Sequence, residues 1–246
     1  MISLKFEEKN LKNSPAKFVE IDKIFSDDVY KELLGSFPFE EMEREDKHKK
    51  IALNKYHKKT LEKFLDENKL WKNFLRFFES DDFVSFVNYF CNLNSYKNVD
   101  FKIEDLNIGY EFSILKNNSV VVPHKDKYGK LLSLVFYFVS DKWEEKYSYG
   151  GTQFYKPKKN ILNSLIFNDS SSFENMDLVS EIKPKANRLL VFQPNKESWH
   201  GVEKINTEDK IGRPAFILTV HRKETLFEKI LNFISPLTSR IQKIIS

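Results

Sequence analysis

Apolar positions in the first hundred residues recur at three- and four-residue spacing, which predicts helices. Ser26-Asp27-Asp28 has the residues of an N-cap and an acidic first turn, and Gly35 would end that helix. Ser80 would cap a further apolar helix that runs to Cys91. Between these two helices lie further apolar residues at helical spacing, namely Leu61, Phe64, Leu65, Trp71, Phe74, Leu75 and Phe78. We therefore expect the first hundred residues to form a helical support for the rest of the chain.

After residue 100 the pattern changes to short runs rich in β-branched and aromatic residues, bounded by turn residues, which is typical of strands. The expected strands are Leu106–Leu115, Val120–Pro123, Leu131–Val139, Thr152–Tyr155, Arg188–Phe192 and Ala215–Val220. The polar stretch Asn168–Asn175 is expected to be a mobile loop. Strands this short and numerous predict a sandwich, barrel or jelly roll. The expected fold class is α+β, mainly β, with a β core in residues 101–222 buttressed by the N-terminal helices.

Residues 223–246 carry an apolar stripe at helical spacing, interrupted at Pro236. The stripe consists of Leu226, Ile230, Ile234, Leu237, Ile241 and Ile245. It predicts a C-terminal helix on the outside of the β core, although such a stripe could also bind a membrane or a partner. No Pro- or Ser-rich linker splits the chain, so a single domain is expected over residues 1–246.

Composition limits the chemistry that is available. The chain has 246 residues, one cysteine and five histidines, so any metal site must use histidines and carboxylates. The net charge is only +4 and lysines alternate with acids, so no nucleic-acid partner is expected. The longest apolar run, Leu131–Val139, is too short to span a bilayer, and Met1–Asn10 lacks a signal-peptide core. A cytoplasmic monomer or homodimer is therefore expected.

One spacing suggests a metal site. His124 and Asp126 close a predicted strand, and residues two apart in an extended chain point to the same side, so both could approach one metal. A solvated loop pair is the competing interpretation. His200, just after the strand Arg188–Phe192, is the candidate third ligand. Two histidines and one carboxylate on one face of a metal are the signature of non-haem Fe(II) oxygenases.

A single arginine strengthens this interpretation. The chain has six arginines against 34 lysines, and Arg213 begins the last predicted strand, thirteen residues after His200. Its planar guanidinium suits bidentate binding of a carboxylate, so a dicarboxylate could bind a metal at one end and Arg213 at the other. An exposed arginine at a strand edge is the alternative. His221 competes as third ligand, but at strand rise it lies roughly 25 Å from Arg213, too far to share one small molecule.

With these residues in place, the sequence resembles the Fe(II)- and 2-oxoglutarate-dependent dioxygenases, specifically the prolyl 4-hydroxylase-like branch. The resemblance covers residues 100–222. After the His-x-Asp motif come Ser133–Phe138, then Asp141-Lys142-Trp143 and Gly150-Gly151, and later Pro184–Phe192, in the family's order. Asn187 stands where the family usually has a turn glycine, a substitution that the turn tolerates because asparagine adopts positive φ. The resemblance implies a double-stranded β-helix.

The resemblance also implies roles for individual residues. His124, Asp126 and His200 match the iron ligands, and Arg213 matches the residue that binds the far carboxylate of 2-oxoglutarate. Tyr137 matches a tyrosine that binds the same carboxylate in part of the family, with plain core packing as the alternative. Ser133 lies four residues before Tyr137, and residues an even number apart in a strand point to the same side. Both should therefore face the barrel interior, and Ser133 is a further candidate near the site.

The implied activity is hydroxylation of an unactivated C–H bond with Fe(II), 2-oxoglutarate and O2, ascorbate as reductant, and succinate and CO2 as co-products. The implied substrate is a small molecule or a peptidyl group, with peptidyl proline, an amino acid or another metabolite all open. Two alternatives remain at this point. The same site could give another oxidative outcome, such as desaturation or epimerisation, or the β-helix could bind a ligand without turnover.

Overall fold

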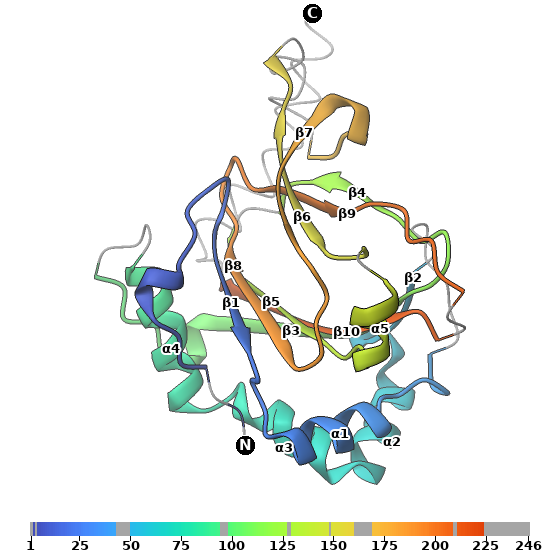
Figure 1. The fold of residues 1–246 in the computed structure, drawn as a ribbon. Helices are drawn as coiled ribbons and strands as arrows, with labels where there is room; N and C mark the ends of the chain where they lie inside the picture. The colour runs from blue at the N-terminus through green and yellow to red at the C-terminus, as the bar shows by residue number, and fades with distance from the viewer. Residues whose placement is uncertain are drawn as a thin grey trace, which may run out of the picture.

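The structure is a computed structural model that describes residues 2, 4–42, 50–93, 98–126, 129–147, 149–159, 169–208 and 211–223. Two antiparallel sheets face each other in this part of the chain (Figure 1). The larger sheet contains, in spatial order, β1 (Lys17–Asp22), β8 (Arg188–Gln193), β5 (Lys130–Tyr137), β10 (Arg213–Arg222), β3 (Leu106–Leu115) and β2 (Lys50–Asn54). The smaller sheet contains β4 (Val121–His124), β9 (Trp199–Val202), β6 (Thr152–Pro157) and β7 (Met176–Ile182).

The chain from β3 onward passes back and forth between the two sheets. Strands β3, β5, β8 and β10 belong to the larger sheet, and β4, β6, β7 and β9 belong to the smaller one. This alternation is the topology of a double-stranded β-helix, so the predicted fold is confirmed. The central strand β5 is buried on both faces: Leu134 and Phe136 pack on the helix side, whereas Val135 and Tyr137 pack between the sheets. Burial on both faces explains why β5 reads as a nearly continuous apolar run.

The predicted N-terminal helices are present. They are α1 (Asp27–Gly35), α2 (Lys58–Glu67), α3 (Lys69–Phe77) and α4 (Asp81–Asn92), and they cover the outer face of the larger sheet (Figure 1). Trp71 of α3 is fully buried, with its ring centroid 4.8 Å from that of Phe112 and 5.1 Å from that of Phe138. The Ser80 hydroxyl accepts a hydrogen bond from the Phe83 amide at 3.3 Å, as expected of an N-cap. Cys91 is a core residue of α4.

Other elements were not predicted. The first hundred residues also supply β1 and β2, which complete the two edges of the larger sheet. Strands β7 and β9 and the short helix α5 (Asp141–Lys146) were likewise missed. In the stretch expected to be a loop, Ser170 forms an isolated bridge with His124. Asn187 has φ of 58°, so the expected positive-φ turn is confirmed.

The C-terminal helix predicted within 223–246 falls on residues 224–246, which lie outside the described part of the chain. Within the described residues, no helix is both long enough and apolar enough to cross a membrane.

Candidate metal centre

His124 and His200 face each other across two neighbouring strands of the smaller sheet. His124 ends β4, His200 is the second residue of β9, and the two are directly paired in the antiparallel ladder. Their ring centroids are 4.3 Å apart. Gly201 follows His200, and a Cβ there would lie 2.5 Å from the carbonyl oxygen of Val121, so only glycine lets β9 approach β4 this closely.

Backbone carbonyl groups orient both imidazole rings. Nδ1 of His124 lies 3.0 Å from the oxygen of Val122, and Nδ1 of His200 lies 2.9 Å from the oxygen of Ser198. A carbonyl can only accept, so Nδ1 carries the proton in both rings and the Nε2 lone pair is available to a metal. Burial, with the nearby charge of His124, lowers the pKa of His200 to about 4. His200 is therefore neutral at neutral pH, the form that binds metals.

Asp126 completes the cluster two residues beyond β4. Its Oδ2 atom lies 3.7 Å from Nε2 of His200. One ligand atom from each of His124, Asp126 and His200 can be chosen so that all three lie within 4.8 Å of one another. Burial raises the pKa of Asp126, but the charge that His200 carries once it is protonated in acid, together with that of Lys130, outweighs burial, and the net pKa lies below its ordinary value. Two imidazoles and one carboxylate form the donor set of a facial Fe(II) site, so these residues fit that metal.

Arg213 lies at the start of β10 and is 3 % exposed. Its Nη1 atom donates to the carbonyl oxygen of Gly150 at 2.8 Å, and its guanidinium lies 5.4 Å from the ring centroid of Tyr137. Nε is buried without a hydrogen-bond partner among the described residues, and no described carboxylate forms an ion pair with this arginine. The alternative of an exposed strand-edge arginine does not hold. A buried guanidinium without a counter-ion favours an anionic ligand.

Tyr137 and Ser133 lie on the face of β5 that points between the sheets, as their parity predicted. Tyr137 shares a hydrogen bond of 2.9 Å with the hydroxyl of Thr152 and also accepts the Thr152 amide at 3.2 Å. Burial raises the pKa of Tyr137, so it is a neutral phenol. The Ser133 hydroxyl lies 3.5 Å from Oδ2 of Asp126. Tyr137 therefore belongs to the surroundings of Arg213, and Ser133 to those of the metal-ligand cluster.

Two residues of the site were missed by the sequence interpretation. Thr152 holds the Tyr137 hydroxyl, and its place directly after Gly150-Gly151 could have drawn attention to it. The Lys130 ammonium forms an ion pair of 2.6 Å with Oδ1 of Asp126. Nothing in the sequence distinguishes Lys130 from the other lysines, because its role depends on how β5 begins relative to β4.

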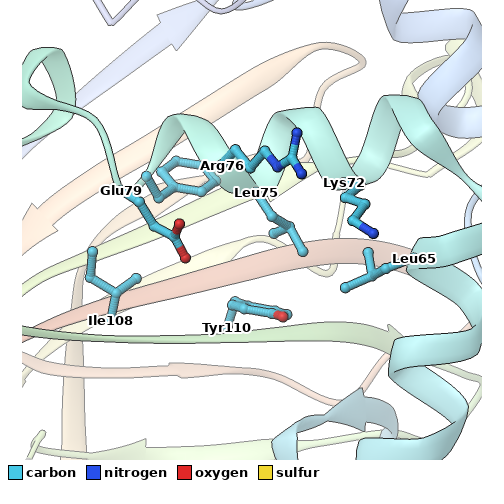
Figure 2. Close-up of a pocket in the computed structure, with 8 residues that line it drawn as sticks. Leu65, Lys72, Leu75, Arg76, Glu79, Ile108 and Tyr110 are labelled. Carbon is cyan, nitrogen blue, oxygen red and sulfur yellow. The ribbon is translucent and has the colours of Figure 1, made fainter.

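A separate cavity of about 270 Å³ lies on the helix side of β3 (Figure 2). It is lined by Leu65, Lys72, Leu75, Arg76, Phe78, Glu79, Ile108 and Tyr110. Ile108 and Tyr110 pack against the helix-side core, whereas the metal-ligand cluster lies between the sheets. This cavity is therefore on the opposite face of the larger sheet and takes no part in the candidate metal centre.

Solved structures with a similar fold include HygX from Streptomyces hygroscopicus with nickel, 2-oxoglutarate and hygromycin B bound. It is 12 % identical, with a TM-score of 0.51, and the match covers 88 % of this chain and 85 % of that chain. A Pseudomonas putida prolyl-4-hydroxylase is 14 % identical, with a TM-score of 0.44 and coverage of 86 % and 95 %. No curated protein matches this sequence.

The family comparison covers the strands that carry the candidate site. Residues 110–218 match the model of the 2OG-Fe(II) oxygenase superfamily. The matched region runs from β3 to β10 and contains the His124, Asp126 and His200 cluster together with Arg213. This match confirms the family resemblance predicted from the sequence for the β core, which is similar to the Fe(II)- and 2-oxoglutarate-dependent dioxygenases.

Proposed function

We propose that this dioxygenase hydroxylates an unactivated C–H bond and that His124, Asp126 and His200 hold its Fe(II). The observation that supports this assignment is the cluster itself, in which one ligand atom of each residue lies within 4.8 Å of the others. Carbonyl groups fix both histidine rings by Nδ1 and leave Nε2 for the metal. With 2-oxoglutarate and O2, bound Fe(II) supplies the oxidising power for hydroxylation, with succinate and CO2 as co-products.

Arg213 is the proposed partner of the far carboxylate of 2-oxoglutarate. The side chain is buried and lacks a described carboxylate partner, and its Nε is a free donor within the described structure. A bound dicarboxylate would supply both the missing charge and the missing acceptor. Tyr137 and Thr152 keep the guanidinium in place by packing and by the hydrogen bonds of the phenol. Tyr137 is a neutral donor, so its hydroxyl can add a hydrogen bond to the same carboxylate.

The substrate proposed for this site is a small molecule or a peptidyl group, such as a peptidyl proline or an amino acid. The interleaving of lysines with acids along the chain argues against a nucleic-acid substrate. Ascorbate is the proposed reductant. The cytoplasmic location and the monomeric or dimeric state stay predictions from the sequence.

The proposal is tested with the wild-type protein. Fe(II) and 2-oxoglutarate added without air should give a weak visible charge-transfer band, and air should then yield succinate. One hydroxylated product for each succinate supports hydroxylation. One desaturated or epimerised product for each succinate supports the corresponding alternative. Bound iron without succinate, across amino-acid and peptide substrates, would favour a binding module. A protein that neither binds iron nor shows the band contradicts the proposed metal centre.

Replacing Gly201 with alanine is expected to weaken metal binding by at least about tenfold, because the new Cβ would lie 2.5 Å from the Val121 oxygen. That oxygen belongs to the backbone and must move, which separates β4 from β9 and His124 from His200. Titration with Mn(II) measures the metal affinity of the variant, and thermal unfolding measures its stability. The control is Gly35→Ala, since a Cβ at Gly35 meets no atom within 4 Å. Equal metal affinity in the two variants would contradict the role of this close approach.

A further inference from the structure

A lysine lies directly against the candidate metal ligands. Lys130 is the first residue of β5, and its Nζ atom is 2.6 Å from Oδ1 of Asp126. The two side chains are only 14 % and 9 % exposed. Water therefore contributes little to solvating this ammonium, and the carboxylate of Asp126 is its main counter-charge.

The two oxygens of Asp126 have different surroundings. Oδ1 accepts the hydrogen bond from Lys130. Oδ2 lies 3.7 Å from Nε2 of His200 and 3.5 Å from the hydroxyl of Ser133. Only Oδ2 therefore faces the histidine side of the cluster, where a shared metal would be bound.

The backbone holds Lys130 in this position. Gly129, just before it, has φ of 90°, a conformation that favours glycine, and its carbonyl accepts the Arg222 amide at 3.0 Å. Lys130 itself pairs with His221 of β10 in the larger sheet. The start of β5 is therefore fixed to β10, and the lysine stem begins from a defined place beside Asp126.

We propose that Lys130 is a positioning residue that restricts Asp126 to one metal-binding oxygen. By holding Oδ1, it would leave Oδ2 alone to a bound metal, and the carboxylate would then not compete with 2-oxoglutarate for a second position on that metal. Its positive charge also opposes the metal cation and favours the dianionic co-substrate at short range. The inference rests on the proposed function, since it requires a metal at this cluster.

The test is Lys130→Met, which keeps an unbranched side chain one heavy atom shorter and removes the charge. Mn(II) affinity, followed by the electron paramagnetic resonance of the free ion, is expected to rise by about tenfold. The affinity of the Mn(II)-loaded protein for 2-oxoglutarate, followed by calorimetry, is expected to fall by about tenfold. If Lys130 were only structural, its replacement would instead lower the affinities for Mn(II) and for 2-oxoglutarate together. Lys130→Arg retains the charge and should bring both affinities back towards wild type.

The matched control is Lys50→Met. Lys50 forms an ion pair of 2.7 Å with Glu111 on the same sheet, close to the 2.6 Å of Lys130, and its side chain is 20 % exposed. This control should leave both affinities within about twofold of wild type. If Mn(II) affinity in Lys130→Met is unchanged or weaker, or if 2-oxoglutarate affinity is unchanged, the inference is wrong. Failure of the wild-type protein to bind Mn(II) would instead contradict the proposed metal centre itself.

Discussion

Replacing Arg213 with methionine is expected to weaken 2-oxoglutarate binding by about 100-fold, or about 2.7 kcal/mol, while leaving metal binding unchanged. Arg213 is 3 % exposed, and its guanidinium lacks a described carboxylate partner. A bound 2-oxoglutarate would supply that partner, so the variant loses a buried, charge-assisted contact. Calorimetric titration of the Mn(II)-loaded protein measures the co-substrate affinity.

The same variant should not lose stability. Burial without a counter-ion lowers the pKa of Arg213, which means that the folded protein disfavours the charged form. Methionine keeps an unbranched apolar stem without the buried charge, so the free energy of unfolding in denaturant should stay the same or rise. If 2-oxoglutarate affinity falls while stability does not, Arg213 has a binding role and not a structural one.

Arg188→Met is the matched control for Arg213. Arg188 has carboxylate partners on β1: its Nε lies 2.6 Å from Oδ1 of Asp22, and its Nη1 lies 2.9 Å from Oε2 of Glu20. This variant should lower stability, because Asp22 and Glu20 each lose the arginine and keep only a lysine partner, and it should leave 2-oxoglutarate affinity unchanged. If both arginine variants lose the same affinity, Arg213 is not the specific partner of the co-substrate.

The strands that position the site could largely be predicted because they are buried on one or both faces. β3 matches the predicted bounds Leu106–Leu115, and β5 differs from its prediction by two residues or fewer at each end. The two strands missed in this region have a weaker strand pattern in their sequence. β7 is an edge strand on which Leu178 and Val179 are exposed. β9 is buried, but it is short and contains a glycine, which strand propensity disfavours. Pairing with neighbouring strands forms these two elements despite their local sequence.

The alternation of side chains along a strand predicted which side the site residues face, but it did not predict their contacts. Alternation placed His124 and Asp126 on one side of an extended chain, and the structure brings both to His200. The ion pair between Lys130 and Asp126 depends on where β5 begins relative to β4. The free donor of Arg213 depends on which side chains surround it after folding. Such contacts depend on the path that the chain takes after folding, and no local pattern in a single sequence records them.

Replacing His200 with glutamine is expected to weaken Mn(II) and Fe(II) binding by more than about 100-fold and to abolish the charge-transfer band. Loss of a partner that merely orients a metal ligand typically costs about 10- to 100-fold in affinity, so loss of the ligand itself should cost more. Glutamine is chosen because the ring packs 5.0 Å from the Phe192 ring, and a smaller side chain would leave a cavity there. Circular dichroism and thermal unfolding should show a folded protein.

The matched control for this variant is His57→Gln. His57 ends the 3-10 helix before α2, where its Nδ1 accepts the Asn54 amide at 3.3 Å, away from the metal-ligand cluster. Its replacement should disturb only that local cap and leave metal affinity within about twofold of wild type. If His200→Gln retains wild-type metal affinity in a folded protein, then the three residues do not form the iron site. The buried, neutral His200 would in that case be a packing residue between β9 and Phe192.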